Sequence, residues 1–262
     1  MNAKLNLSIC VGILAGSMGL ATSAQAFSFT TNYTAELLGS NAAKGNIWLD
    51  SVTFGDTTVS NFGLVNQVNI LKNDLWTKDN TGAASADRGD LADGLVQEKL
   101  TDAGAVMALG NTNLNNIIDG EDRGAFSMNV WFDKAVDNLF FWERGRNSKM
   151  EIQAVDKLGN SIGNLLTIDS SKWNYAGFDI DTMEIGGKQT VGSLGVSLAD
   201  LGLSSAIAGV RVSAEGTSFF NGPDWKVVGS AASVPEPGMV MGLGAIASGL
   251  LVSNRRKKAQ KA

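Results

Sequence analysis

The feature that most constrains the fold is a series of short segments in which apolar and polar residues alternate. In "AFSMNVWF" the apolar side chains of Phe126, Met128, Val130 and Phe132 fall on one face of an extended chain. A period of two is the pattern of a half-buried strand. The chain has 31 glycines and only three prolines in 262 residues, which agrees with strands joined by turns. The sequence therefore predicts an all-β domain.

Other segments repeat this pattern with turn residues between them. They are rich in Thr, Val and aromatic residues, and they cover residues 27–37, 46–54, 138–145, 207–214 and 224–230. Residues 149–168 read as two strands around a turn at 157–160, and "DKAVD" (133–137) reads as a short connection. In 46–54 the apolar phase changes between Leu49 and Val52, which predicts a β-bulge.

Helical signals are few. Thr101 is placed to cap a short helix that runs to Leu109 and stops at Gly110. Residues 198–201 indicate one further helical turn. Many short strands predict a β-sandwich or jelly roll. We favour a jelly roll of the galactose-binding type, because "VDNLFFWERG" and "MEIQAVD" form an aromatic strand, a loop and a returning strand. That comparison is an analogy at the level of fold.

The first 26 residues have the pattern of a secretory signal peptide. Lys4 precedes an apolar run, and the small residues Ala24 and Ala26 in "AQA" predict cleavage after Ala26. Two alternatives fit less well. A lipoprotein site at Cys10 lacks the small residue expected before it, and a permanent anchor does not account for the cleavage site.

The residues that remain after cleavage exclude several chemistries. Cys10 is the only cysteine and the chain has no histidine. Disulfides, cysteine nucleophiles, Ser-His-Asp triads and His/Cys zinc sites are therefore excluded. A carboxylate pair, as in glycoside hydrolases, is the remaining catalytic option, but no pair is fixed at a defined separation. We expect a protein that is not an enzyme.

Charge is divided unevenly along the chain. Residues 27–234 hold 15 of the 21 Lys and Arg and 25 of the 26 Asp and Glu, a net charge of −10. Five of the last eight residues are Lys or Arg. An acidic domain disfavours nucleic acid as a partner, because binding phosphates requires cations.

The C-terminus has three parts in order. Pro235, Glu236 and Pro237 come first, and residues 238–253 follow without a charge. Sixteen residues make a helix of about 24 Å, which is short for a membrane span. The third part is a basic cluster that the positive-inside rule places in the cytoplasm: Arg255, Arg256, Lys257 and Lys258.

This arrangement resembles the PEP-CTERM sorting signal of Gram-negative bacteria. The resemblance implies that signal peptidase removes the N-terminus. It further implies that an exosortase then cuts near the tripeptide and releases the protein to the cell surface or matrix, often in bacteria that make exopolysaccharide. Glu236 is then part of the signal and not a catalyst. Before this cleavage, the C-terminal helix holds the precursor in the membrane.

Most of residues 27–234 also resemble exosortase-dependent surface proteins of the cyanobacterial type. The segments that carry this resemblance are "NTGAASADRGD", "NLNNIIDGEDRGAF", "AVDNLFFWERGRNSKMEIQAVDKLGNSIG" and "FNGPDWKVVGS". We therefore expect five regions: a signal peptide (1–26), a β-sandwich ectodomain (27–230), a spacer with the tripeptide (231–237), a transmembrane segment (238–254) and a basic cytoplasmic tail (255–262).

Three segments contain candidate site residues. Residues 72–94 form an acidic loop in which Trp76 is either a sugar platform or an anchor to the core. In "NNIIDGEDRG", Asp119, Glu121 and Asp122 crowd a turn that Asp224 could join, which suggests a calcium site. The alternative there is a polar turn stabilised by Arg123. Calcium is the only cofactor that these residues suggest.

The third segment is "FFWERGRN". Its side chains could bind a sugar by stacking and hydrogen bonding: Trp142, Glu143, Arg144 and Arg146. The alternative is a buried ion pair between Glu143 and one of the arginines. Two functions from different classes remain. One is a structural or interaction protein of the cell surface, associated with exopolysaccharide, and the other is a carbohydrate-binding module.

Overall fold

The computed structural model describes residues 26–36, 45–75, 83–84, 99–181 and 187–232. Within them the fold is mostly β, every strand pair is antiparallel, and there is one short α-helix. This confirms the all-β prediction. No helix in these ranges is long and apolar enough to span a membrane. Residues 1–25 of the expected signal peptide, Trp76, the sorting signal and the C-terminal helix lie outside the described residues.

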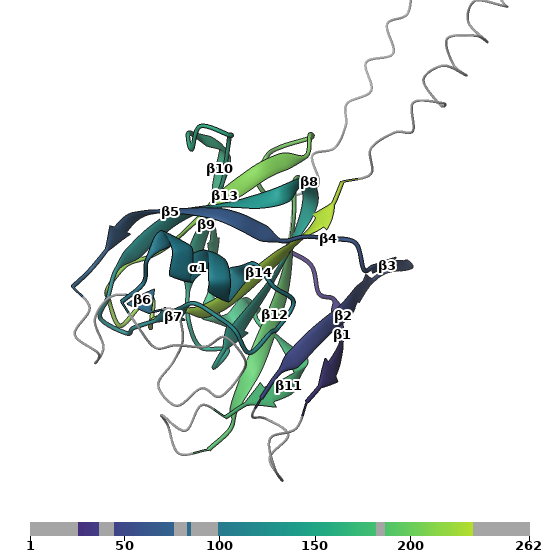
Figure 1. Cartoon of the computed structure of the whole chain (residues 1–262), viewed down its shortest axis with the longest axis horizontal. Helices are drawn as coiled ribbons and strands as arrows, with labels where there is room; N and C mark the ends of the chain where they lie inside the picture. The colour runs from purple at the N-terminus through teal and green to yellow at the C-terminus, as the bar shows by residue number, and fades with distance from the viewer. Residues whose placement is uncertain (1–25, 37–44, 76–82, 85–98, 182–186, 233–262) are drawn as a thin grey trace, which may run out of the picture.

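A single long strand, β8 (Phe126–Arg144), organises the large sheet (Figure 1). Its first half pairs with β5 (Val65–Asn73) and β13 (Ile207–Ala214). Its second half pairs with β12 (Gln189–Ser197) and β14 (Asp224–Ala231). The two halves thus join different sets of strands. The remaining members of this sheet are β4 (Phe62–Gly63), β9 (Met150–Val155), β10 (Ser161–Ile168) and β11 (Asn174–Ile180).

The prediction of two strands joined by a loop at 133–137 was wrong. Residues 133–135 are exposed, but the chain remains extended through them. Asp133 replaces ladder contacts at this bend, since its N–H donates to Leu64 O (2.9 Å) and its Oδ1 accepts from Leu64 N (2.9 Å). Pairing resumes at Val136, which lies opposite both Ile207 and Ala231. The backbone is thereby satisfied across the bend.

The second half of β8 is buried on both faces. Leu139 and Phe141 belong to the larger apolar cluster, together with Met128 and Val130 of the first half. Phe140 and Trp142 point to the opposite face and belong to a second cluster. A strand covered on both faces reads as a continuous apolar run, which explains "NLFFW".

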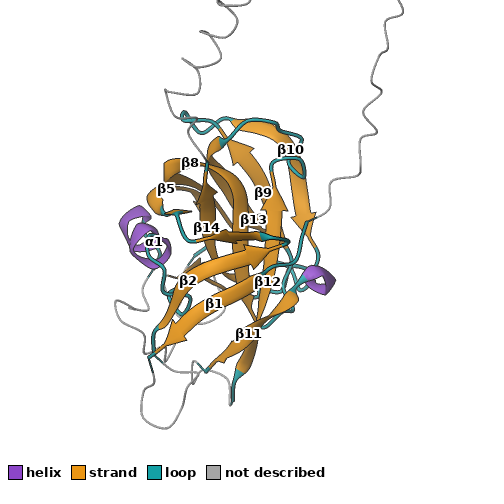
Figure 2. Ribbon diagram, turned by 90° about the vertical axis from the view of Figure 1, so that its right-hand side faces the viewer, coloured by secondary structure: helices purple, strands orange, loops and turns teal. Residues whose placement is uncertain are grey.

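A three-stranded sheet covers that second face. It contains β1 (Thr30–Ala35), β2 (Ile47–Phe54) and β3 (Thr57–Val59). Figure 2 shows β1 and β2 lying over the region of β12, and Phe29, Ile47 and Leu49 pack there against Phe140 and Trp142. The bulge expected in β2 is confirmed. Asn32 pairs with Ser51 and Tyr33 pairs with Leu49, which leaves Asp50 as the extra residue.

The helix α1 (Asp102–Leu109) has the bounds that the sequence predicts. Thr101 Oγ1 accepts a hydrogen bond from Gly104 N (3.0 Å), and Gly110 ends the helix. The helix lies beside β5 (Figure 1). After it, the buried ammonium of Lys226 donates to Ala108 O, Asn111 Oδ1 and Asn116 O at 2.8–3.0 Å. Burial lowers the pKa of Lys226 well below its usual range, while these three acceptors satisfy every donor of the ammonium.

Other local predictions divide into confirmed and wrong. The turn at 157–160 joins β9 and β10, and β13 and β14 lie where the alternation placed them. Residues 198–201 form a turn and not a helix. The sequence patterns missed β3, β4, β5, β11 and β12, and also the two-residue pair β6 (Ala83–Ala84) and β7 (Asp119–Gly120).

Candidate functional site

The expected calcium ligands lie partly around an arginine. Arg144 Nη2 lies 3.0 Å from Asp224 Oδ2 and 3.7 Å from Asp119 Oδ1, and the side chains of Arg144 and Asp119 are buried. Asp224 Oδ1 also accepts from Gly120 N (3.0 Å). This buried ion cluster ties the start of β14 to β7 and to the end of β8.

The other two expected ligands do not complete a cation site. Glu121 is partly exposed and Asp122 is exposed. Among the described residues, no group of three His, Cys, Asp or Glu is arranged to hold a metal ion. Arg144 supplies the positive charge beside both Asp119 and Asp224. The alternative of a turn stabilised by arginine fits this geometry better, with Arg144 in place of Arg123.

The aromatic side chain expected to bind sugar is a packing group. Trp142 is buried against Phe29, and its Nε1 donates to Thr31 Oγ1 (3.0 Å). Glu143 and Arg144 are buried as well. Because both faces of this half of β8 are covered, none of these three side chains reaches solvent. Of the other tryptophans described, Trp48 is partly buried and three are buried: Trp131, Trp173 and Trp225.

Glu143 is a buried acid on the core side of β8, opposite Trp225 of β14. Burial raises the pKa of Glu143 to about 8, and the nearby charge of Asp224 adds to the increase. Ser148 and the backbone at Arg146 oppose it. The opposition is weak because neither carboxyl oxygen has a hydrogen-bond partner of good geometry, and the Ser148 hydroxyl donates to Asn221 O (2.7 Å). The side chain is therefore protonated at neutral pH.

Arg146 reaches the surface in a strained loop between β8 and β9. It has φ of 56°, and Gly145 before it has φ of 105°. Its Nη2 donates to Trp173 O (3.0 Å), and its guanidinium carbon lies 5.9 Å from the ring centroid of Tyr175. Tyr175 is half exposed and donates to Asp179 Oδ1 (3.1 Å). Of the four residues expected in "FFWERGRN", Arg146 is the one placed beside an exposed aromatic ring.

A second exposed ring lies in the loop between β13 and β14. Lys149 Nζ lies 3.2 Å from the ring centroid of Phe219 and 2.7 Å from Asp169 Oδ1. Phe219 is 70% exposed, whereas its neighbour Phe220 is in the core. The ring of Phe219 is thus held at the surface by a cation–π contact.

These two rings lie at one end of the fold. We call this end the loop surface, and it consists of Arg146, Lys149, Asp169, Tyr175 and Phe219. Backbone and side-chain contacts join the three chain segments that contain these residues. Trp173 Nε1 donates to Ser148 O (2.8 Å), Ser148 Oγ donates to Asn221 O, and Lys149 N donates to Phe220 O (2.8 Å). The buried ion cluster and Glu143 lie on the strand ends that carry these loops. The strand ends beneath the loop surface are therefore held in place by buried contacts.

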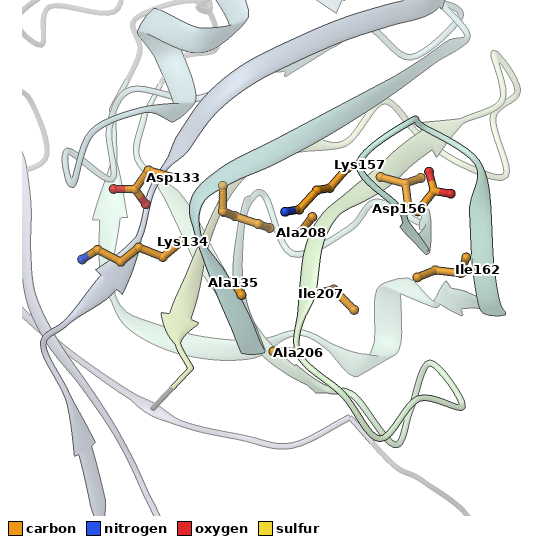
Figure 3. Close-up of a pocket in the computed structure, with 11 residues that line it drawn as sticks. Asp133, Lys134, Ala135, Asp156, Lys157, Ile162, Ala206, Ile207 and Ala208 are labelled. Carbon is orange, nitrogen blue, oxygen red and sulfur yellow. The ribbon is translucent and has the colours of Figure 1, made fainter. Parts of the chain in front are cut away.

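A hollow of about 500 Å³ lies elsewhere, at the bend of β8 (Figure 3). Phe132, Val155 and Ile207 contribute apolar side chains to it. Most of the charged side chains around the hollow already make hydrogen bonds to other groups of the protein. Lys134 extends away and donates to Asn61 Oδ1 (2.7 Å). The Asp156 carboxylate accepts from the Asn160 side chain and from the backbone of its own turn, and these hydrogen bonds lower its pKa. Lys157 is the rim cation directed toward the hollow (Figure 3).

Comparison with protein families, curated proteins and solved structures finds no match.

Sequence reasoning missed Tyr175, Phe219, Lys149 and Asp169. The signal that could have indicated Phe219 is "SFFNGPDW", where two adjacent phenylalanines precede a turn. Such a pair in a loop places one ring inward and leaves the other near solvent. Tyr175 and Asp169 carry no comparable signal, because β11 itself was not predicted.

Proposed function

We propose that this chain is an exported, exosortase-processed protein of the cell surface or extracellular matrix, with a structural or interaction role and without enzymatic activity. Signal peptidase and an exosortase are the processing partners, and the C-terminal helix holds the precursor in the membrane before release. The proposal rests on the resemblance of the two ends of the chain to export and sorting signals. We further propose association with exopolysaccharide.

One structural observation supports this proposal. Ala232 N donates to Ala135 O (2.8 Å), so the described chain ends at the bend of β8, three residues before Pro235. The loop surface lies at the other end of β14, which begins at Asp224. Eight strand residues separate the two ends by about 23 Å. A precursor held by its C-terminus would therefore present the loop surface away from the membrane.

The test is the C-terminus of the mature protein. In a bacterium with an exosortase, we expect surface-located protein to end near residues 235–237. A Pro235→Ala/Pro237→Ala variant should remain in the membrane fraction and keep Ala262, whereas Leu158→Ala, outside the signal, should be processed normally. Mass spectrometry distinguishes these products. Surface-located wild-type protein with an intact Ala262 would contradict the proposal.

The second candidate function is a carbohydrate-binding module. The observation that favours it is the pair of exposed rings, Phe219 and Tyr175, each next to a cation. This candidate would agree with a jelly-roll domain of the galactose-binding type, which we propose as the finer description of the fold. It requires no calcium ion, because Asp119 and Asp224 already contact Arg144.

A further inference from the structure

We propose that the loop surface binds a neutral polysaccharide chain, with Phe219 as the main stacking platform and Tyr175 as a second. This inference depends on the carbohydrate-binding candidate above and specifies its residues and its ligand class. It is independent of how the protein is exported.

Phe219 is held in a position suited to stacking. One face of its ring contacts Lys149, and Lys149 is itself only 10% exposed and paired with Asp169. Phe219 stays outside the core, because the ring of the adjacent Phe220 already occupies the core position beneath this loop. At 70% exposure Phe219 forgoes much of the stabilisation that burial of a phenylalanine gives. A held ring with an open face is what the C–H face of a pyranose requires.

Polar groups suitable for sugar hydroxyls lie beside the rings. The Asp169 carboxylate is about half exposed and can accept hydrogen bonds from hydroxyls. Arg146 lies next to Tyr175, and the Tyr175 hydroxyl is itself at the surface. Stacking rings interspersed with a few fixed polar groups are the usual composition of a ligand site.

Backbone strain is concentrated in the same loops. Among the described residues, the two non-glycine residues with positive φ are Arg146 (56°) and Asn221 (54°). Asparagine tolerates this conformation, but arginine does so rarely. Strain of this kind persists where the surroundings impose it, and it often marks a binding site. Ser148 links these loops, since its hydroxyl donates to Asn221 O and its backbone carbonyl accepts from Trp173 Nε1.

Charge favours a neutral ligand over a polyanion. Residues 27–234 carry a net charge of −10, which repels an acidic polymer. The local cations are also engaged, since Lys149 pairs with Asp169 and Arg146 donates to Trp173 O. A protein partner is less favoured, because each of the two rings lies against a cation, whereas the core of a protein interface is depleted of charged residues.

The experiment is affinity electrophoresis of the full-length protein in mild detergent. The gels contain dextran, glucomannan, galactomannan or hydroxyethylcellulose as neutral probes, and alginate as the polyanion. We expect at least one neutral probe to retard the wild type. Phe219→Ala should weaken that binding about tenfold and Tyr175→Ala less, since each removes a stacking ring.

Two further variants make the test specific. Leu158→Ala removes a still more exposed apolar side chain from the turn between β9 and β10, and it should bind as the wild type does. Arg146→Gly relieves the positive φ, so its thermal unfolding midpoint should not fall even if its binding weakens. Retention of wild-type binding by Phe219→Ala would overturn the proposal. Retardation by alginate alone, or by no probe, would also overturn it. Normal processing with no glycan binding would refute this inference and leave the export proposal intact.

Discussion

Glu143→Gln isolates the effect of one buried acid on stability. Glu143 is completely buried, and neither carboxyl oxygen has a hydrogen-bond partner of good geometry. Glutamine has nearly the same shape and approximates the protonated acid, but it cannot ionise. The substitution should therefore change how stability depends on pH while leaving the packing nearly unchanged.

The magnitude follows from the pKa of the folded state. Burial raises the pKa of Glu143 from 4.5 to about 8. Below pH 4.5 the group is protonated in both states and costs nothing. Between pH 4.5 and 8 the unfolded chain ionises first, so the free energy of unfolding falls by about 1.4 kcal/mol per pH unit. The loss from this group should reach about 3 kcal/mol at pH 7 and about 5 kcal/mol above pH 8.

The assay is urea unfolding of the wild type and Glu143→Gln at several pH values from 4 to 9, followed by tryptophan fluorescence. The quantity of interest is the difference in free energy of unfolding between the two proteins at each pH. Other titrating groups, including Lys226, cancel in this difference. We expect it to shift in favour of the variant by about 5 kcal/mol between pH 4 and pH 9.

A core variant without a titratable change is the control. Phe141→Leu alters the same face of β8, and it should lower the free energy of unfolding equally at every pH. A flat difference curve for Glu143→Gln would refute the reasoning. It would mean that the carboxylate is solvated or strongly hydrogen bonded in the folded protein, contrary to the geometry around it.

Two further predictions concern stability. Arg144→Met should lower the free energy of unfolding by about 3–5 kcal/mol, because it leaves two carboxylates close together and partly desolvated; adding Asp224→Asn should restore part of the loss in urea unfolding, and no restoration would contradict the ion cluster. Thr101→Ala should cost about 1 kcal/mol by removing the cap of α1, whereas Thr101→Ser should cost little, and equal losses in thermal unfolding would argue against the cap.

The sequence predicted β13 and β14 close to their true bounds, although β13 is buried mainly on one face and β14 on both. It missed β5, whose pairing with β8 contains two register shifts, and it missed β12. β12 has glycines at 192 and 195 that weaken any strand pattern. Those glycines make room for other groups. A Cβ at Gly195 would lie 2.3 Å from the Phe27 ring, and one at Gly192 would lie 2.7 Å from Trp173. The need for glycine at these two positions arises from tertiary contacts, which a local sequence pattern does not show.

In the candidate site too, some features follow from the local sequence and others depend on contacts with distant residues. Successive residues at the start of "FFWERGRN" point to opposite faces of β8, but the local pattern could not show that a second sheet covers the face with Trp142. That cover consists of β1 and β2, and Thr31 of β1, which accepts from Trp142, is 111 residues earlier in the chain. Similarly, no local signal indicates that Phe220 and not Phe219 enters the core, because the loop conformation at Asn221 decides it.

The ionisable groups buried at this end of the sheet are better explained by positional precision than by stability. Apolar residues of similar size often stabilise a core as well as a buried ion pair does, so the Arg144 cluster is weak evidence for stabilisation. The arginine instead fixes the relative positions of two strands, because its planar group can contact Asp119 of β7 and Asp224 of β14 at once. Those contacts fix the start of β14 and with it the loop that carries Phe219. An exposed aromatic platform is useful only if its orientation is set before the ligand arrives, because ordering it on binding would reduce affinity. The buried charges beneath the loop surface and the exposed rings on it are therefore parts of the same arrangement.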